Sequence, residues 1–233
     1  YVSLQENNAL AVVDLESAEV TDILPLGFKD HSQSGNELDP SDNDDGINIR
    51  NIPTFGMLQP DSIDAFEVDG QTFIITANEG DARDFDGFSE EAGLDDLLED
   101  GLLDLNDDGD ADDENTEIEF QGETITLNDL LADDFLGDLD LTSATGDLDD
   151  DGLIEQLFSF GGRSFSIFNE SGEQVFDSGD DFERITSELI PDDFNSDNDE
   201  NDSFDSRSDA KGPEPEAIAT GIVDGTPYAF IGL

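Results

Sequence analysis

The sequence contains no cysteine, no tryptophan and very few positive charges. Without cysteine the chain can form neither a disulfide framework nor a thiol-based active site. Only seven Lys and Arg stand against 63 Asp and Glu, for a formal net charge of −56. Nucleic acids and anionic membrane surfaces are therefore poor partners, because binding to them depends on clustered Lys and Arg. No apolar run approaches the length of a transmembrane helix.

The chain nevertheless has the means to build a packed core, with 35% hydrophobic residues and 17 Phe among its 233 residues. One large domain, or one domain with an insertion, is the natural expectation for this length. A charge of this size opposes compaction through self-repulsion. Dissolved salt can screen that repulsion, and bound cations can neutralise it. We therefore expect an extracellular or cell-surface setting that is saline or rich in calcium.

Short strand patterns separated by polar turns occupy both ends of the chain. Two predicted hairpins turn at Asp69-Gly70 and Asp224-Gly225, and a shift of 155 residues superposes them without a gap. Further strands are predicted within residues 1–26 and 154–179, with Gly161-Gly162 as one of the turns. Repeated antiparallel units without crossover helices predict an all-β fold, a partial β-propeller of about three to four blades. A β-sandwich is the alternative.

Residues 89–146 interrupt the strand pattern. Leucines at positions 94, 97, 98 and 102 have helical spacing. Residues 117–127 predict a small hairpin, and residues 128–136 a short helix capped by Asn128. The sequence thus divides into blades at 1–88, an acidic insertion at 89–146, and blades at 147–233 that continue past the C-terminus.

Two acidic stretches match the calcium-loop pattern D-x-[DN]-x-[DN]-G, which places oxygen ligands at alternate positions before a sharp glycine turn. Composition alone predicts about 0.2 matches to this pattern in a chain of this length, whereas two occur. Neither stretch has Glu at the twelfth position, so paired helices of the calcium-sensor kind are not expected. The predicted calcium ligands are Asp104, Asn106, Asp108, Asp110 and Asp112 in the first loop, and Asp147, Asp149, Asp151 and Glu155 in the second.

The few positive charges lie in short polar segments near predicted strand ends. They either form ion pairs that lock loops together or converge with calcium on an anionic ligand such as a phosphate, a carboxylate or a sulfated sugar. Arg50, Arg83 and Arg163 are the candidates for the second role. His31, the single histidine, is a candidate general base and excludes a three-histidine zinc site. Weaker metal or ligand candidates are Asp44, Asp45, Glu79, Asp81, Asp84, Glu214 and Glu216, and the acidic clusters at 39–46 and 193–209 reflect either metal binding or salt adaptation.

Several segments together resemble the choice-of-anchor I family. They include "GFKDHS" (27–32), "DGINIRN" (45–51), "ITANEGDARDFDGFSEE" (75–91), "FGGRSFSIF" (160–168) and "FNSDNDENDSFDSRSDAKGPEPE" (194–216). The resemblance spans nearly the whole chain except about residues 91–145. It implies a secreted, propeller-like protein with further blades or other subunits beyond this chain. The same family is related to mesenchyme-specific cell-surface glycoproteins and to alkaline-phosphatase-like and phytase-like propellers.

Two functional hypotheses follow. The first is a non-catalytic, calcium-binding extracellular module for surface attachment or for interaction with ions or mineral, with an anionic small molecule or surface polymer as a further partner. The alternative is a calcium-dependent phosphomonoesterase, in which metal ions activate water and Arg50, Arg83 and Arg163 hold the phosphate. The sequence shows no nucleophile–base pair, which favours the first hypothesis.

Overall fold

The computed structural model describes residues 1–44, 46–197 and 203–233, and in these ranges the protein is mostly β-structure with few helices. The expectation of an all-β fold is confirmed at this level. The described sheets do not close into a propeller ring, so the number of blades stays a prediction. Asp45 lies outside the described residues. No helix in the described ranges is long and apolar enough to cross a membrane.

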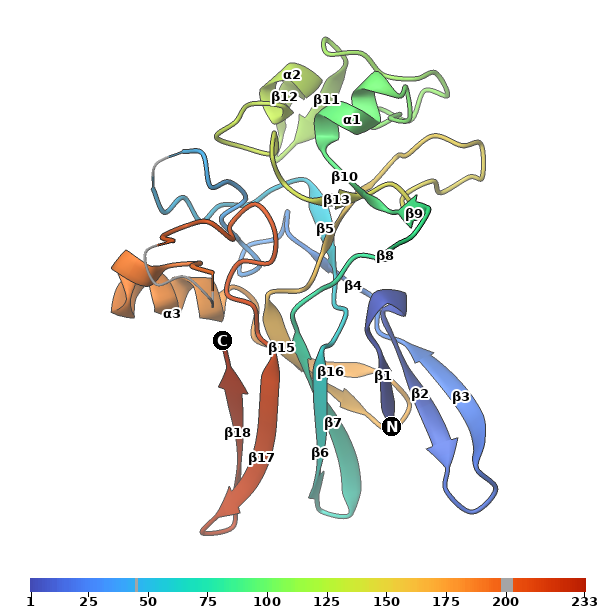
Figure 1. The fold of residues 1–233 in the computed structure, drawn as a ribbon, viewed down its shortest axis with the longest axis vertical. Coiled ribbons are helices and arrows are strands. Elements are labelled where there is room, and N and C mark those ends of the chain that lie inside the picture. The colour runs from blue at the N-terminus through green and yellow to red at the C-terminus, as the bar shows by residue number, and fades with distance from the viewer. Residues whose placement is uncertain (45, 198–202) are drawn as a thin grey trace.

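Three antiparallel sheets occupy one end of the molecule (Figure 1). The first, β1-β2-β3, follows the N-terminus, and the second has the order β16-β15-β7-β6. The third is the hairpin β17-β18. Their strands are β1 (Val2–Leu4), β2 (Ala9–Asp14), β3 (Glu19–Pro25), β6 (Ser62–Val68), β7 (Gln71–Asn78), β15 (Ser164–Asn169), β16 (Gln174–Asp177), β17 (Ala217–Val223) and β18 (Thr226–Gly232), with the 3₁₀ turn η1 (Gln5–Asn7) after β1.

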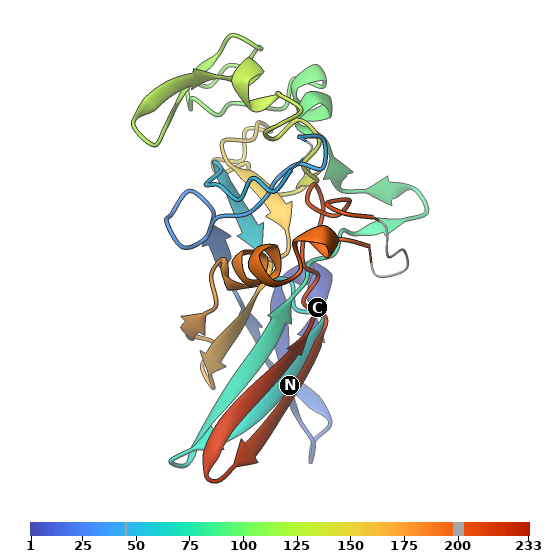
Figure 2. The same cartoon turned by 90° about the vertical axis from the view of Figure 1, so that its left-hand side faces the viewer.

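The two hairpins with Asp-Gly turns form as predicted. Asp69 and Gly70 have φ of 54° and 78°, and Asp224 and Gly225 have φ of 51° and 81°, so both central residues are left-handed in each turn. This backbone matches the twist of the flanking strands, and Asp-Gly adopts it at low cost. The hairpins lie side by side (Figure 2), joined where the Thr220 amide donates to the Asp64 carboxylate at 2.7 Å.

A five-stranded sheet in the middle of the molecule joins early and late parts of the chain in the order β10-β13-β14-β5-β4. Strand β14 pairs in parallel with β5, which lies a hundred residues earlier. The prediction that Gly161-Gly162 connects two paired strands is therefore wrong, because the chain passes there from this sheet to β15. The strands are β4 (Phe28–Asp30), β5 (Thr54–Met57), β10 (Glu91–Ala92), β13 (Leu141–Thr142) and β14 (Leu157–Phe160), and the hairpin β8 (Asp84–Phe85) and β9 (Phe88–Ser89) precedes β10.

The other end of the molecule carries the helices α1 (Leu94–Glu99) and α2 (Leu127–Leu130) and the hairpin β11 (Glu117–Phe120) and β12 (Glu123–Thr126). The predicted cap of α2 is wrong: the Thr126 hydroxyl accepts from the Asp129 amide, and the Asp129 carboxylate accepts from the Thr126 amide. This reciprocal pair satisfies two backbone donors that a helix start leaves free.

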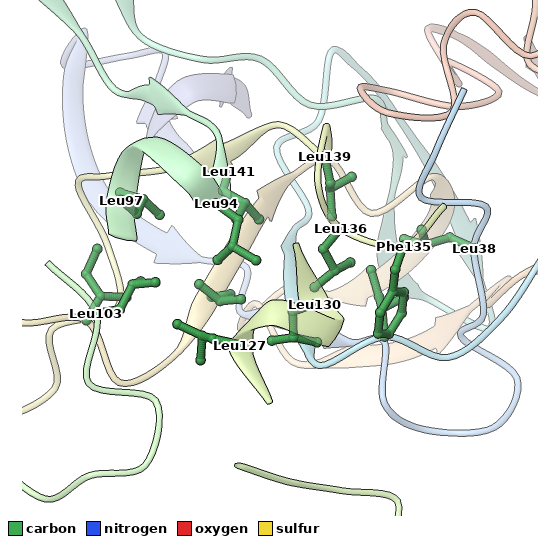
Figure 3. Packing of buried hydrophobic residues seen from close by; sticks show 13 residues of the cluster. Leu38, Leu94, Leu97, Leu103, Leu127, Leu130, Phe135, Leu136, Leu139 and Leu141 are labelled. Carbon is green, nitrogen blue, oxygen red and sulfur yellow. The ribbon is translucent and has the colours of Figure 1, made fainter. Parts of the chain in front are cut away.

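A leucine-rich core holds this end on the five-stranded sheet (Figure 3). It contains residues from both sides of the predicted insertion boundaries, which themselves stay a prediction. Its buried members are Leu38, Ile52, Leu94, Leu97, Leu103, Leu127, Leu130, Phe135, Leu136, Leu139, Leu141, Ile154 and Leu157.

Helix α3 (Asp181–Leu189), followed by the 3₁₀ turn η2 (Pro191–Asp193), was not predicted. Two of its apolar residues, Ile185 and Leu189, are 44% and 74% exposed, whereas Glu183 is 1% exposed. The third, Phe182, is partly buried, and its ring centre lies 6.0 Å from that of Phe165. The helix is therefore attached through the buried Glu183 and one aromatic contact rather than through a continuous apolar face.

Candidate metal centre

The loop that follows β13 is shaped by its own carboxylates. Both oxygens of Asp147 accept backbone amides, from Asp151 at 3.2 Å and from Gly152 at 2.9 Å. Asp150 and Gly152 have φ of 65° and 97°, and these left-handed residues turn the chain around the Asp147 side chain. The Glu155 carboxylate accepts from the Leu148 amide at 2.6 Å and ties the end of the loop to its start.

This folding gathers four carboxylates. One oxygen each of Asp147, Asp149, Asp151 and Glu155 lies within 4.8 Å of the other three. In the described ranges no other group of three or more acidic, His or Cys residues is gathered so closely. Hard cations such as Ca²⁺ prefer oxygen ligands of this kind. The residue types and their spacing therefore fit a calcium ion.

The earlier acidic stretch, residues 104–112, repeats the same hydrogen-bond pattern. The Asp104 carboxylate accepts from the amides of Asp108 at 3.0 Å and Gly109 at 2.8 Å. The Asp112 carboxylate accepts from the Leu105 amide at 2.6 Å. Position by position, these bonds match those that Asp147 and Glu155 accept. The carboxylates of this stretch are not gathered as closely, and burial raises the pKa of Asp112.

The two acidic loops are joined to one another. Leu103, just before the first loop, forms a parallel bridge with Ile154 in the second. The Asp104 amide donates to the Ile154 carbonyl at 2.9 Å, and the Ile154 amide donates to the Leu102 carbonyl at 2.7 Å. Both residues of the bridge belong to the leucine-rich core. The loops are thus anchored on packed side chains at the same place.

Most of the positive charges are engaged with carboxylates. Within the described residues, Arg50 alone among the seven forms no ion pair; its guanidinium lies 4.2 Å from the centre of the Phe135 ring. The pairs are Lys29–Asp177 (3.3 Å), Arg83–Glu90 (2.6 Å), Arg163–Glu183 (2.8 Å), Arg184–Asp180 (3.9 Å), Arg207–Glu214 (2.5 Å) and Lys211–Glu79 (2.9 Å).

Arg163 is the most completely engaged of the three arginines predicted to hold an anion. Its side chain is 4% exposed, and besides Glu183 it donates to the carbonyls of Asp39 (2.8 Å), Ser208 (2.7 Å) and Ala210 (2.9 Å). Its nitrogens are therefore used within the protein. Arg83 pairs with Glu90, and this hydrogen bond raises the pKa of Arg83. Arg50, Arg83 and Arg163 thus contact different partners rather than one shared point.

The remaining candidates lie at several places. Glu79 and Asp81 both approach Lys211, at 2.9 and 3.5 Å, and Glu214 is paired with Arg207. Burial raises the pKa of Glu216. The ion pairs of Lys211 with Glu79 and Asp81 connect the chain after β7 to the segment before β17. Asp84 is exposed in β8, and the Asp44 carboxylate accepts from the Gly46 amide at 3.0 Å.

His31 is buried in the interior. Its Nδ1 lies 2.7 Å from the Asn36 carbonyl, so this nitrogen carries the proton, and Nε2 has no hydrogen-bond partner. Burial, aided by the charge of Lys29, lowers the pKa of His31 to about 3. At 1% exposure the ring packs against Gly56 and not against solvent.

Sequence reasoning did not single out Asp39, Asn195 and Asp205. All three are buried, and each keeps one side-chain oxygen without a hydrogen-bond partner. They lie in the acidic clusters 39–46 and 193–209, whose residues look alike in the sequence. Only the fold separates the buried members from the exposed ones.

Comparison with known proteins gives three similarities. The family model of the choice-of-anchor I domain matches residues 1–233. Gigasin-3a of Magallana gigas is 36% identical over 105 residues, which cover 43% of this chain and 37% of that protein. The mesenchyme-specific cell surface glycoprotein of Strongylocentrotus purpuratus is 29% identical over 248 aligned residues, which cover 91% of this chain and 29% of that protein. The chain therefore spans about a third of the length of these curated relatives. No solved structure matches the chain significantly.

Proposed function

The chain belongs to the choice-of-anchor I domain family, as its motifs predicted, and from this premise we propose that it is an extracellular, calcium-binding module of a cell-surface protein. Its role is surface attachment or interaction with ions or mineral. The relative from Strongylocentrotus purpuratus, which is named a cell surface glycoprotein, supports the setting. The three antiparallel sheets at one end of the molecule are then blades of a propeller, completed by further chain or by other subunits.

The observation that carries the calcium proposal is the convergence of Asp147, Asp149, Asp151 and Glu155, with one oxygen of each within 4.8 Å of the others. Four carboxylates at this separation offer a hard cation several oxygen ligands at one point. The amides of Asp151 and Gly152 hold Asp147 in place without any ion. The loop is therefore pre-arranged, which reduces the ordering cost of binding.

The distribution of positive charge favours a binding module over a phosphomonoesterase. An enzyme acting on phosphate must reverse the local negative field with metal ions and arginines. Arg83 and Arg163 instead neutralise Glu90 and Glu183, and Arg163 is buried. A surface of uncompensated carboxylates is suited to attract cations, whether dissolved or at the face of a mineral.

Thermal unfolding in calcium, in magnesium and in NaCl of matched ionic strength tests the proposal. Calcium that binds only the folded state raises stability by RT ln(1 + [L]/Kd), beyond the screening that all three salts provide. We expect the largest rise in Tm with calcium, and we expect that excess to shrink when Asp147, Asp149 and Asp151 are replaced by Asn. Equal shifts in Tm in all three salts would mean that the salts act only by screening charge, and would contradict the proposal.

Adsorption to particles of a calcium mineral tests the attachment role. The wild-type chain should adsorb, and the triple Asn variant of the loop should adsorb more weakly. A triple variant that removes three exposed carboxylates elsewhere, Glu16, Glu67 and Asp86, is the control for net charge. Equal loss in both variants would show that adsorption follows total charge and not the loop.

A further inference from the structure

Two segments far apart in the sequence meet beside α3, away from the two acidic loops (Figure 1). The first comprises residues 39–44 and 46–49, and the backbone pairing of Leu38 with Arg50 closes its base. The second is the segment that includes Asn195 and residues 203–209. Arg163 joins them, because its two terminal nitrogens donate to the Asp39 carbonyl and the Ser208 carbonyl at 2.8 and 2.7 Å.

Each segment contributes one fully buried carboxylate. Asp39 is 0% exposed and Asp205 is 3% exposed. One oxygen of Asp39 accepts from the Asn48 amide at 2.6 Å, and one oxygen of Asp205 accepts from the Ser208 hydroxyl at 2.6 Å. The other oxygen of each, Asp39 Oδ1 and Asp205 Oδ2, has no hydrogen-bond partner. Buried carboxylate oxygens without a partner are rare, because such a group loses its hydration without replacement.

A neutral oxygen is available at the same place. Asn195 is 4% exposed, and its Nδ2 donates to the Ser208 hydroxyl at 2.9 Å, the same hydroxyl that donates to Asp205. The Asn195 Oδ1 atom has no hydrogen-bond partner. Three side chains thus keep three free oxygen acceptors, while their other polar atoms are held in place.

No positive side chain compensates these carboxylates. In the described part of the chain neither Asp39 nor Asp205 forms an ion pair, and the nearby Arg163 is committed to Glu183. Burial raises the pKa of Asp39 to about 7 and that of Asp205 to about 6, and repulsion from Asp205 contributes to the rise at Asp39. Asp42 and Asp44, on the more exposed side of the loop, add to the rise at Asp205.

We propose that a calcium ion binds between these segments, held by Asp39 Oδ1, Asp205 Oδ2 and Asn195 Oδ1. Two carboxylates would neutralise its charge, and a hard cation accepts an amide oxygen as readily as water. Asp44 and Asp42 lie on the solvent side and would guide the ion inward. The site is separate from the loop 147–155, and it does not depend on calcium binding there. Its consequence is structural, because the ion would join segments that are more than 150 residues apart in the sequence.

Calcium stoichiometry tests this proposal in a chain whose loop is disabled by Asp147→Asn, Asp149→Asn and Asp151→Asn. In equilibrium dialysis with bound metal quantified, adding Asp39→Asn should remove one calcium per chain, and adding Asp205→Asn should remove one. The two together should also remove only one, because both residues serve the same ion. Glu67→Gln on exposed β6 removes an equal charge and should remove none. Unchanged stoichiometry in both Asn variants, or losses that add to two, would overturn the proposal.

A stability measurement separates loss of the ion from failure to fold. In EDTA, Asp39→Asn and Asp205→Asn should be at least as stable as their parent, because each removes an uncompensated buried charge. In millimolar calcium the parent should become the more stable protein. A calcium-induced rise in Tm that is the same in both variants as in the parent would mean that the two buried carboxyls are simply protonated, and would overturn the proposal.

Discussion

Replacing Arg163 by Met removes the guanidinium that joins α3 to the Asp39 carbonyl and to the carbonyls of Ser208 and Ala210. The variant keeps a long side chain and a Cβ at this left-handed position, where φ is 48°. It leaves Glu183 buried with only the Asp39 amide, at 2.6 Å, as a donor. Breaking a buried ion pair by removing one partner costs about 3–5 kcal/mol. In a domain of this size that loss lowers Tm by about 6–20 °C.

The matched control is Arg184→Met on the same helix. The side chain of Arg184 is 51% exposed, and its partners are Asp180 and Asp181. An exposed pair of this kind contributes about 0–1 kcal/mol. The double variant Arg163→Met/Glu183→Gln should be more stable than Arg163→Met alone, because it no longer buries an unpaired charge. Urea unfolding followed by circular dichroism at fixed calcium concentration measures all four proteins.

The pH dependence of the same variants adds a test with a definite sign. Burial raises the pKa of Glu183, and Arg163 opposes that rise. A carboxyl whose pKa is higher in the folded state binds more protons there, so stability falls as pH increases through the folded pKa. Without Arg163 the pKa of Glu183 rises further. The loss of unfolding free energy caused by Arg163→Met should therefore be smaller at pH 5 than at pH 8. If Arg163→Met and Arg184→Met lose the same unfolding free energy at both pH values, this account is refuted. Arg163 would then again be a candidate for binding a ligand.

Three further substitutions test other parts of the fold. Gly161→Ala should lower the free energy of unfolding by about 3 kcal/mol, because the added Cβ would lie 1.9 Å from the Glu79 carbonyl oxygen. Gly70→Ala is the comparison: its added Cβ meets no atom within 4 Å, and it should lower the free energy of unfolding by about 1 kcal/mol. Urea unfolding measures both. Thr126→Ala should lower the free energy of unfolding by about 1 kcal/mol through loss of the α2 cap, and an unchanged urea midpoint would contradict it. Burial, with repulsion from Glu91 and Asp209, raises the pKa of Asp140 to about 7. Wild-type stability should therefore fall relative to Asp140→Asn by about 1–2 kcal/mol between pH 5 and pH 8, after allowing for partial exposure, and parallel pH profiles would contradict it.

Local signals in the sequence were sufficient for the hairpins and for the shape of the acidic loops. Asp-Gly turns fix hairpin register without help from the rest of the chain, as at Asp69-Gly70. The pattern of the loop 147–155 likewise encodes its own hydrogen bonds, because Asp147 and Glu155 accept amides only a few residues away. Contacts of this kind are determined within one short segment.

Contacts between distant segments left no such signal. The parallel pairing of β14 with β5 depends on strands that read in sequence as ordinary apolar runs, and Gly161 looked like a hairpin glycine. Helix α3 was not predicted because it is held by Glu183 and by Phe182 alone among its apolar residues, so no apolar stripe marks a buried face. Asp39 and Asp205 could not be separated from the exposed acids around them, because burial is a property of the folded chain.

The parallel bridge between Leu103 and Ile154 joins the bases of the two acidic loops, and we expect the joined residues to open as one local unit. Opening the chain at this base breaks the hydrogen bonds that the Asp104 and Ile154 amides donate across the bridge. Their amide hydrogens should consequently exchange with solvent at a common rate, set by the same opening event. A change that slows opening at the bridge should therefore slow exchange of both amides. A substitution in residues 147–155 that alters this opening should thus be detected at Asp104, more than forty positions away, as a change in amide protection.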